Sequence, residues 1–103
     1  MKFVNLTPHV IAINDGRTFP SVGLARVSAT FGDFDDDGVT EQVFGAVEGL
    51  PDPQDGTLYI VSGLVLTAMA GSDRKDLVAP ASGHPEVIRN DKGHIVSVPG
   101  FIR

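Results

Sequence analysis

The sequence predicts a mainly-β domain of the α+β class, a small sheet or partly open barrel of about six to eight short strands with one short buried helix. Its 103 residues match the commonest size of a single domain. Its 12 glycines and 7 prolines are spread along the chain, as is typical of turns between short strands. Because there is neither a linker nor a repeat, we expect one domain over residues 1–103.

Apolar runs bounded by turn residues predict strands in the first half of the chain at 2–6, 10–13, 18–21, 23–29 and 40–47. Pro8 separates the first two, because proline fixes φ and lacks an amide donor. Asn14-Asp15-Gly16 is a turn that returns the second strand to the third. Alternation places Ala25, Val27 and Ala29 on one face of the fourth strand, and Val43, Gly45 and Val47 on one side of the fifth.

The segment Thr57–Ser62 is nearly continuous in β-forming residues, which indicates a central, buried strand. The helix is predicted to follow at Leu64–Ala70, where no residue breaks it. Ser62 is suited to cap its start and Gly71 to close it in the left-handed conformation. Since this helix is apolar on all sides, we expect it to be buried, in the core or in a subunit interface.

The last quarter of the chain predicts a short extended piece at Leu77–Pro80 and a hairpin of Glu86–Arg89 with His94–Val98. Asp91-Lys92-Gly93 supplies the turn of that hairpin. The apolar pair Phe101 and Ile102 is expected to dock on the core.

Charge and composition exclude several functions. Eight Lys and Arg against 13 Asp and Glu give a net charge of −5, which disfavours nucleic acid and anionic membranes as partners. A small anionic ligand remains compatible, because a local arginine site can lie in an acidic protein. The absence of cysteine excludes disulfides, thiolate metal sites and a cysteine nucleophile. No apolar run typical of a signal peptide or a membrane span is present, so we expect a cytoplasmic protein.

The acidic segment Asp33–Gly38 begins like a calcium-binding EF-hand loop, with aspartates at alternate positions before a glycine. Phe44 stands where the bidentate glutamate should be, and no helical pattern flanks the segment. A solvated acidic turn is the favoured interpretation, and weak calcium binding outside the EF-hand pattern is the alternative.

Ser62 and Arg74 lie at the two ends of the predicted helix, where free amides and a guanidinium could together hold a phosphate or carboxylate. The alternative is a plain serine cap and an arginine paired with Asp73 or Asp76. No phosphate-loop or nucleophile-elbow motif is present, which argues against Ser62 as a nucleophile.

The three histidines, His9, His84 and His94, lack the spacing of a zinc motif, and we predict neither a metal nor a cofactor. His84 and His94 are interpreted as surface residues. His9 follows a polar break at Thr7-Pro8, so it is interpreted as a buried structural histidine, with a ligand contact as the alternative.

Several segments together resemble a family of short, uncharacterised proteins from bacteriophages, prophages and high-GC bacteria. They are Asn5-Leu6-Thr7-Pro8-His9, Gly49-Leu50-Pro51-Asp52-Pro53, Gly56-Thr57-Leu58-Tyr59-Ile60-Val61-Ser62, Leu64-Val65, Arg74-Lys75-Asp76-Leu77-Val78-Ala79-Pro80 and Gly100-Phe101-Ile102-Arg103. The acidic segment 33–38 is not part of the shared pattern. The resemblance implies a phage accessory protein, and small acidic proteins of this kind often act against host defences.

The resemblance favours an oligomeric sponge that sequesters a nucleotide-derived immune signal without cleaving it. The expected ligand-binding residues are His9, Tyr59, Ser62, Arg74, Asp76 and Ser82. Tyr59 would stack on a base or, alternatively, belong to the core. A metal-free hydrolase or lyase with His9 or His84 as general base is a second hypothesis. A protein-binding or virion component, with Phe101 and Ile102 in a contact between chains, is a third.

Overall fold

The computed structural model describes all residues from 1 to 103 and confirms a mainly-β fold with one short helix. Its strands are β1 (Lys2–Asn5), β2 (Ile11–Ala12), β3 (Thr18–Phe19), β4 (Arg26–Phe31), β5 (Gln42–Glu48), β6 (Thr57–Ile60), β7 (Leu77–Pro80), β8 (Ile88–Arg89), β9 (Ile95–Ser97) and β10 (Phe101–Ile102). The helix is α1 (Gly63–Ala68). The ten short strands exceed the six to eight expected, and they form open sheets with no closed barrel.

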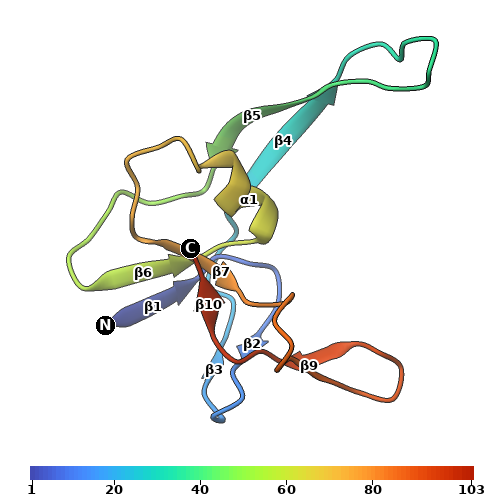
Figure 1. Ribbon diagram of the computed structural model, residues 1–103. Helices are drawn as coiled ribbons and strands as arrows, with labels where there is room; N and C mark the ends of the chain where they lie inside the picture. Colours follow the sequence, from blue (N-terminus) through green and yellow to red (C-terminus); the bar gives the residue numbers. More distant parts are fainter.

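A four-stranded sheet in the order β1-β6-β7-β10 is the centre of the molecule (Figure 1). β6 is parallel to both β1 and β7, whereas β10 is antiparallel to β7. The connection from β6 to β7 contains α1, as parallel neighbours require a crossover. The prediction that Thr57–Ser62 is the central buried strand is confirmed, since Ile60 and Val61 have no exposed surface.

Hydrophobic clusters cover the central sheet on both faces, because side chains alternate along each strand. On one face, Tyr59 and Val61 pack with Val65 of α1 and with Leu77. On the other, Ile60 packs with Ile11, Val78 and Val98. A trio of aromatic rings, Phe3, Phe19 and Phe101, borders this second cluster with centroids 5.2 to 5.7 Å apart. The docking of Phe101 is thus confirmed.

The helix departs from its prediction in burial and in its C-terminal end. Of its residues only Val65 is buried, and Leu64 is 48% exposed, so the expectation that the helix is buried within the chain's own core is wrong, whereas burial in a subunit interface stays a prediction. A single helix that packs on one face of a sheet buries only the side that contacts the sheet. It ends at Ala68, and Gly71 does not adopt a positive φ; the amide of Met69 instead donates back to Thr67 and Val65. This helix is also too short to cross a membrane.

Three two-stranded ribbons extend the sheet. β2 pairs with β3 across Asp15-Gly16, and β8 pairs with β9 across Asp91-Lys92-Gly93, as predicted. β4 pairs with β5, but the register shifts between Val27 and Ala29, so that Phe44 faces Ala29. The predicted face of Val43, Gly45 and Val47 is therefore wrong, because the irregularity turns Val43 outward.

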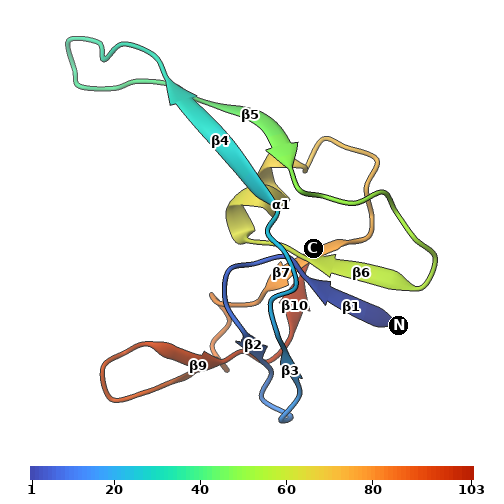
Figure 2. The same cartoon turned by 180° about the vertical axis from the view of Figure 1, so that it is seen from behind.

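The β4–β5 ribbon and the loop that joins its strands form an arm, residues 26–48, that projects from the body beyond α1 (Figures 1 and 2). Val27 and Val47, at its base, pack against the cluster around Val65. The radius of gyration is 15.6 Å, above the roughly 13 Å of a compact chain of this length. Only 17 of 103 residues are buried, which leaves the chain with much uncovered apolar surface.

Candidate functional site

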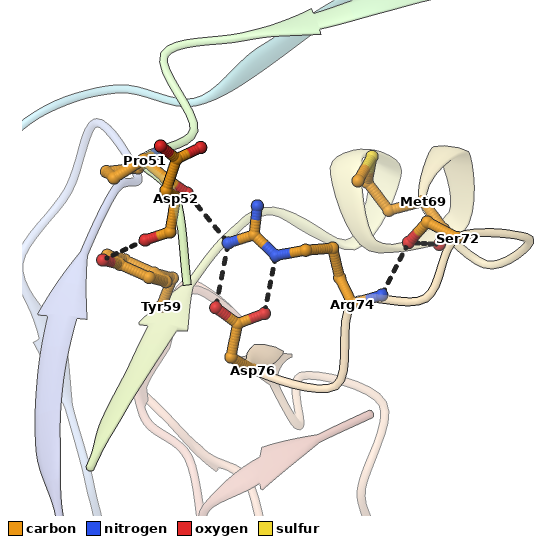
Figure 3. Close-up of polar contacts among 7 residues, drawn as sticks. All are labelled: Pro51, Asp52, Tyr59, Met69, Ser72, Arg74 and Asp76. Atoms are coloured by element: carbon orange, nitrogen blue, oxygen red, sulfur yellow. Dashed lines mark hydrogen bonds and ion pairs between the residues drawn. The ribbon is translucent and has the colours of Figure 1, made fainter. Parts of the chain in front are cut away.

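The predicted residues Arg74 and Asp76 form a bidentate ion pair in the loop between α1 and β7 (Figure 3). Arg74 Nε donates to Asp76 Oδ1 at 2.8 Å, and one terminal nitrogen donates to Oδ2 at 2.9 Å. The same terminal nitrogen donates to the carbonyl of Pro51 at 2.9 Å. The side chains are only 17% and 15% exposed. The pair therefore ties the Leu50–Gly56 turn to the loop before β7.

Each partner stabilises the charge of the other. The hydrogen bonds from Arg74 hold the pKa of Asp76 below its ordinary value, although burial acts in the opposite direction. The hydrogen bond to Asp76 likewise raises the pKa of Arg74. The pairing of Arg74 with Asp76, one of the two alternatives expected from the sequence, is the arrangement observed.

Tyr59 lies beneath this ion pair in the core. The guanidinium carbon of Arg74 is 5.9 Å from the centroid of its ring, and the phenol donates to the carbonyl of Asp52 at 3.2 Å. Its exposed fraction is 2%. Of the two roles expected for Tyr59, stacking on a base or belonging to the core, the structure shows the core position.

Ser62 is the N-cap of α1, as predicted. Its Oγ accepts from the amide of Val65 at 3.2 Å, and its carbonyl accepts from Leu66. The plain serine cap is therefore observed.

His9 and Ser82 lie apart from the ion pair, on exposed loops. The His9 carbonyl accepts from the Asn5 side-chain amide at 2.8 Å and from Thr7 Oγ at 3.1 Å, while its imidazole is exposed. The expectation of a buried His9 is wrong. The buried side chain of Asn5, and not the imidazole of His9, forms the hydrogen bonds to the backbone of this segment. Neither His9 nor Ser82 lines either of the two largest hollows of the molecule.

The histidines and aspartates do not assemble into a cluster able to hold a metal ion. In the acidic loop, Asp35 Oδ1 accepts from the amides of Asp37 and Val39 at 2.9 and 3.0 Å. Its carboxylate thus shapes the turn, which matches the interpretation of a solvated acidic loop. His84 Nδ1 accepts from the Glu86 amide at 3.0 Å, which places any proton of the neutral ring on Nε2.

The largest hollow was not predicted from the sequence. It has a volume of about 610 Å³ and lies between α1, the loop before β7 and the end of the chain. We call it the basic groove, and its lining residues are Leu66, Thr67, Met69, Ala70, Arg74, Lys75, Leu77, Ile102 and Arg103. Ile102, which was expected to dock on the core, is 50% exposed and lines this groove instead.

The basic groove combines an apolar floor with cationic groups. None of its lining residues is acidic. The ion pairs of the molecule leave Lys75 and Arg103 without a carboxylate partner. A neighbouring hollow of about 490 Å³ shares Arg74, Lys75 and Arg103 but is also lined by carboxylates. Of the residues predicted to bind a ligand, only Arg74 lies in the basic groove, with one terminal nitrogen not engaged by Asp76 or Pro51.

Neither the family models nor the curated proteins nor the solved structures include a match to this chain.

Proposed function

We propose that this chain binds a small anionic ligand with an apolar part, and that the basic groove holds it. The carrying observation is that Lys75, Arg103 and Arg74 line the same hollow as Leu66, Met69 and Leu77, and that no acidic side chain lines it. In a chain of net charge −5, such a local concentration of positive charge favours an anion at this place. Its volume of about 610 Å³ is that of a small-molecule site.

A nucleotide-derived signal is the ligand class that we propose. Its phosphates would pair with Lys75 and Arg103, and its base would lie on the apolar floor formed by Leu66 and Met69. The resemblance to phage proteins favours a sponge that withholds such a signal from a host defence.

Binding without turnover is the favoured mode. Guanidinium and ammonium groups donate hydrogen bonds and stay protonated near neutral pH, so the lining of the groove supplies positive charge but no general base. His9 and His84, the bases considered for a hydrolase or lyase, lie outside the lining of this groove.

The test has two parts. Mass spectrometry of the protein denatured after purification from phage-infected or defence-carrying cells should release an intact phosphate-bearing molecule. Calorimetric titration with adenosine 5′-diphosphate should show binding, and titration with adenosine should show much less. Turnover products on chromatography would favour the enzyme hypothesis instead.

The variant Lys75→Glu with Arg103→Glu should weaken diphosphate binding by about a hundredfold, since two attractive charges become repulsive. Lys92→Glu is the control for a single charge reversal outside the groove, because Lys92 is exposed in the turn between β8 and β9. Equal affinities of the two variants would refute the groove as the site. If no phosphate compound is released and the diphosphate does not bind, the proposed function is wrong.

A second candidate function, a protein-binding or assembly component, is favoured by the apolar surface of the arm. Phe31, Phe34, Val39 and Val43 are each more than half exposed there. A two-stranded ribbon is only marginally stable by itself in water, so such an arm gains from a partner that covers it.

A further inference from the structure

We propose that the tip of the arm of one copy docks in the basic groove of a second copy, so that this chain self-associates. The inference concerns the same groove as the proposed ligand site, but it does not depend on the ligand being a nucleotide. The tip would occupy the groove when no small ligand does, and the two occupants would exclude each other.

The tip presents an aromatic ring among carboxylates. Phe34 is 71% exposed, with Asp33 and Asp35 on either side, and Asp36 and Asp37 follow. Asp35 is used within the turn, where its carboxylate accepts two backbone amides. The other carboxylates form no ion pair in the chain. An exposed phenyl ring next to unpaired negative charges is a surface that another binding site can cover.

The basic groove is the chemical complement of this tip. Its floor of Leu66, Met69 and Leu77 offers apolar surface to a phenyl ring, and Lys75 and Arg103 offer unpaired positive charge to the flanking aspartates. Because the rest of the molecule is predominantly acidic, the tip would be repelled from most of its surface. Charge complementarity therefore selects the groove as the docking place for the tip.

The partner must be another copy, since the tip lies at the far end of the arm, away from the body of its own chain that carries the groove (Figures 1 and 2). Both views show the arm leaving the body at α1, with its tip at the far end of the ribbon (Figures 1 and 2). The ribbon is anchored at its base by Val27 and Val47, which pack beside Val65. Backbone pairing along β4 and β5 from Arg26 to Phe31 keeps it extended.

Sedimentation velocity over a range of protein concentrations tests the proposal with wild-type protein and without added nucleotide. We expect concentration-dependent association at about 0.1 M salt that weakens toward 1 M, where the Debye length falls from about 10 to about 3 Å. A wild-type chain that stays monomeric at low salt throughout the range would overturn the proposal.

Two charge-reversed variants locate the contact. One carries Asp33→Lys and Asp36→Lys in the tip, and the other carries Lys75→Glu and Arg103→Glu in the groove. Each alone should associate at least about tenfold more weakly than wild type, because like charges then face each other. Asp91→Lys, in the turn between β8 and β9, is a control for a single charge reversal outside the contact and should associate as wild type does.

The equimolar mixture of the two reversed variants distinguishes docking from misfolding. The lysine tip of one then meets the glutamate groove of the other, so the mixture should associate more strongly than either component alone. If the mixture fails to associate while both variants retain the circular dichroism of wild type, or if either variant alone associates normally, the proposal is wrong. Loss of diphosphate binding in the groove variant is a separate readout, so this result and that of the ligand proposal can differ.

Discussion

Replacing Asp76 by asparagine should destabilise the fold at neutral pH, because Arg74 then keeps its place but loses its counter-charge. The asparagine side chain has the same shape and retains one oxygen acceptor for the guanidinium. Of the two hydrogen bonds, at 2.8 and 2.9 Å, between side chains that are 17% and 15% exposed, one loses its acceptor, because the amide nitrogen of asparagine donates, and the other loses its charge.

The expected loss follows from the burial of the pair. A hydrogen bond to a charged group contributes about 1.5–3 kcal/mol, against about 1 kcal/mol for a neutral one. Removing one partner of a fully buried pair costs about 3–5 kcal/mol, and this pair is only partly buried. Arg74 also keeps its hydrogen bond to the Pro51 carbonyl. We therefore expect the free energy of unfolding to fall by about 2 kcal/mol at pH 7.

The pH dependence of this difference provides a second check. The pKa of Asp76 is lowered in the folded state by its hydrogen bonds with Arg74. A depressed pKa contributes stability that is fully present above the unfolded value, near 3.9, and is lost as the pH falls through the folded value. The difference between wild type and Asp76→Asn should thus be constant from about pH 5 to pH 7 and shrink below about pH 4.

Urea unfolding measured by tyrosine fluorescence suits this experiment, because Tyr59 is the only tyrosine, there is no tryptophan, and its ring lies against Arg74. Circular dichroism gives the control for global unfolding. Unchanged urea midpoints at pH 7, or a deficit that persists undiminished in acid, would contradict the role assigned to this ion pair.

Two further substitutions test how the arm and the first strand are held. Gly49→Ala should lower the free energy of unfolding, measured by urea denaturation, by about 1–3 kcal/mol. The reason is that Gly49 has φ +81° and that a β carbon there would strike the carbonyl of Leu24. A stability equal to wild type would refute this. Asn5→Ala should lower the free energy of unfolding by about 2–4 kcal/mol. The buried amide of Asn5 donates to the carbonyls of His9 and Phe19 and accepts from Thr7. A loss below about 0.5 kcal/mol would show that water replaces these hydrogen bonds.

The sequence was sufficient where a local pattern determines the structure. The alternation at Ala25, Val27 and Ala29 leaves these residues more covered than their neighbours, and Gly16 and Gly93 adopt the positive φ that their turns require. Ser62 caps α1 because the cap depends on residues only three positions apart.

The missed features depend on contacts between distant segments. The register shift that places Phe44 opposite Ala29 arises from pairing between strands, and Gly45, which lies at the irregularity in β5, was its only local sign. The basic groove joins residues 66–77 with Ile102 and Arg103, which are adjacent only because β10 pairs with β7. The only local sign of the groove in the sequence was Arg103, which directly follows the apolar pair Phe101 and Ile102. Arg74 and Asp76 were found because they lie two residues apart.

The site itself is tested most directly by two-dimensional amide NMR of the ¹⁵N-labelled protein titrated with adenosine 5′-diphosphate. We predict shifts confined to the lining of the basic groove, at Leu66, Lys75, Leu77 and Arg103, with the amides of His9 and Ser82 unchanged. Shifts centred on His9 or Ser82, or none at all, would contradict the assignment of the groove as the ligand site.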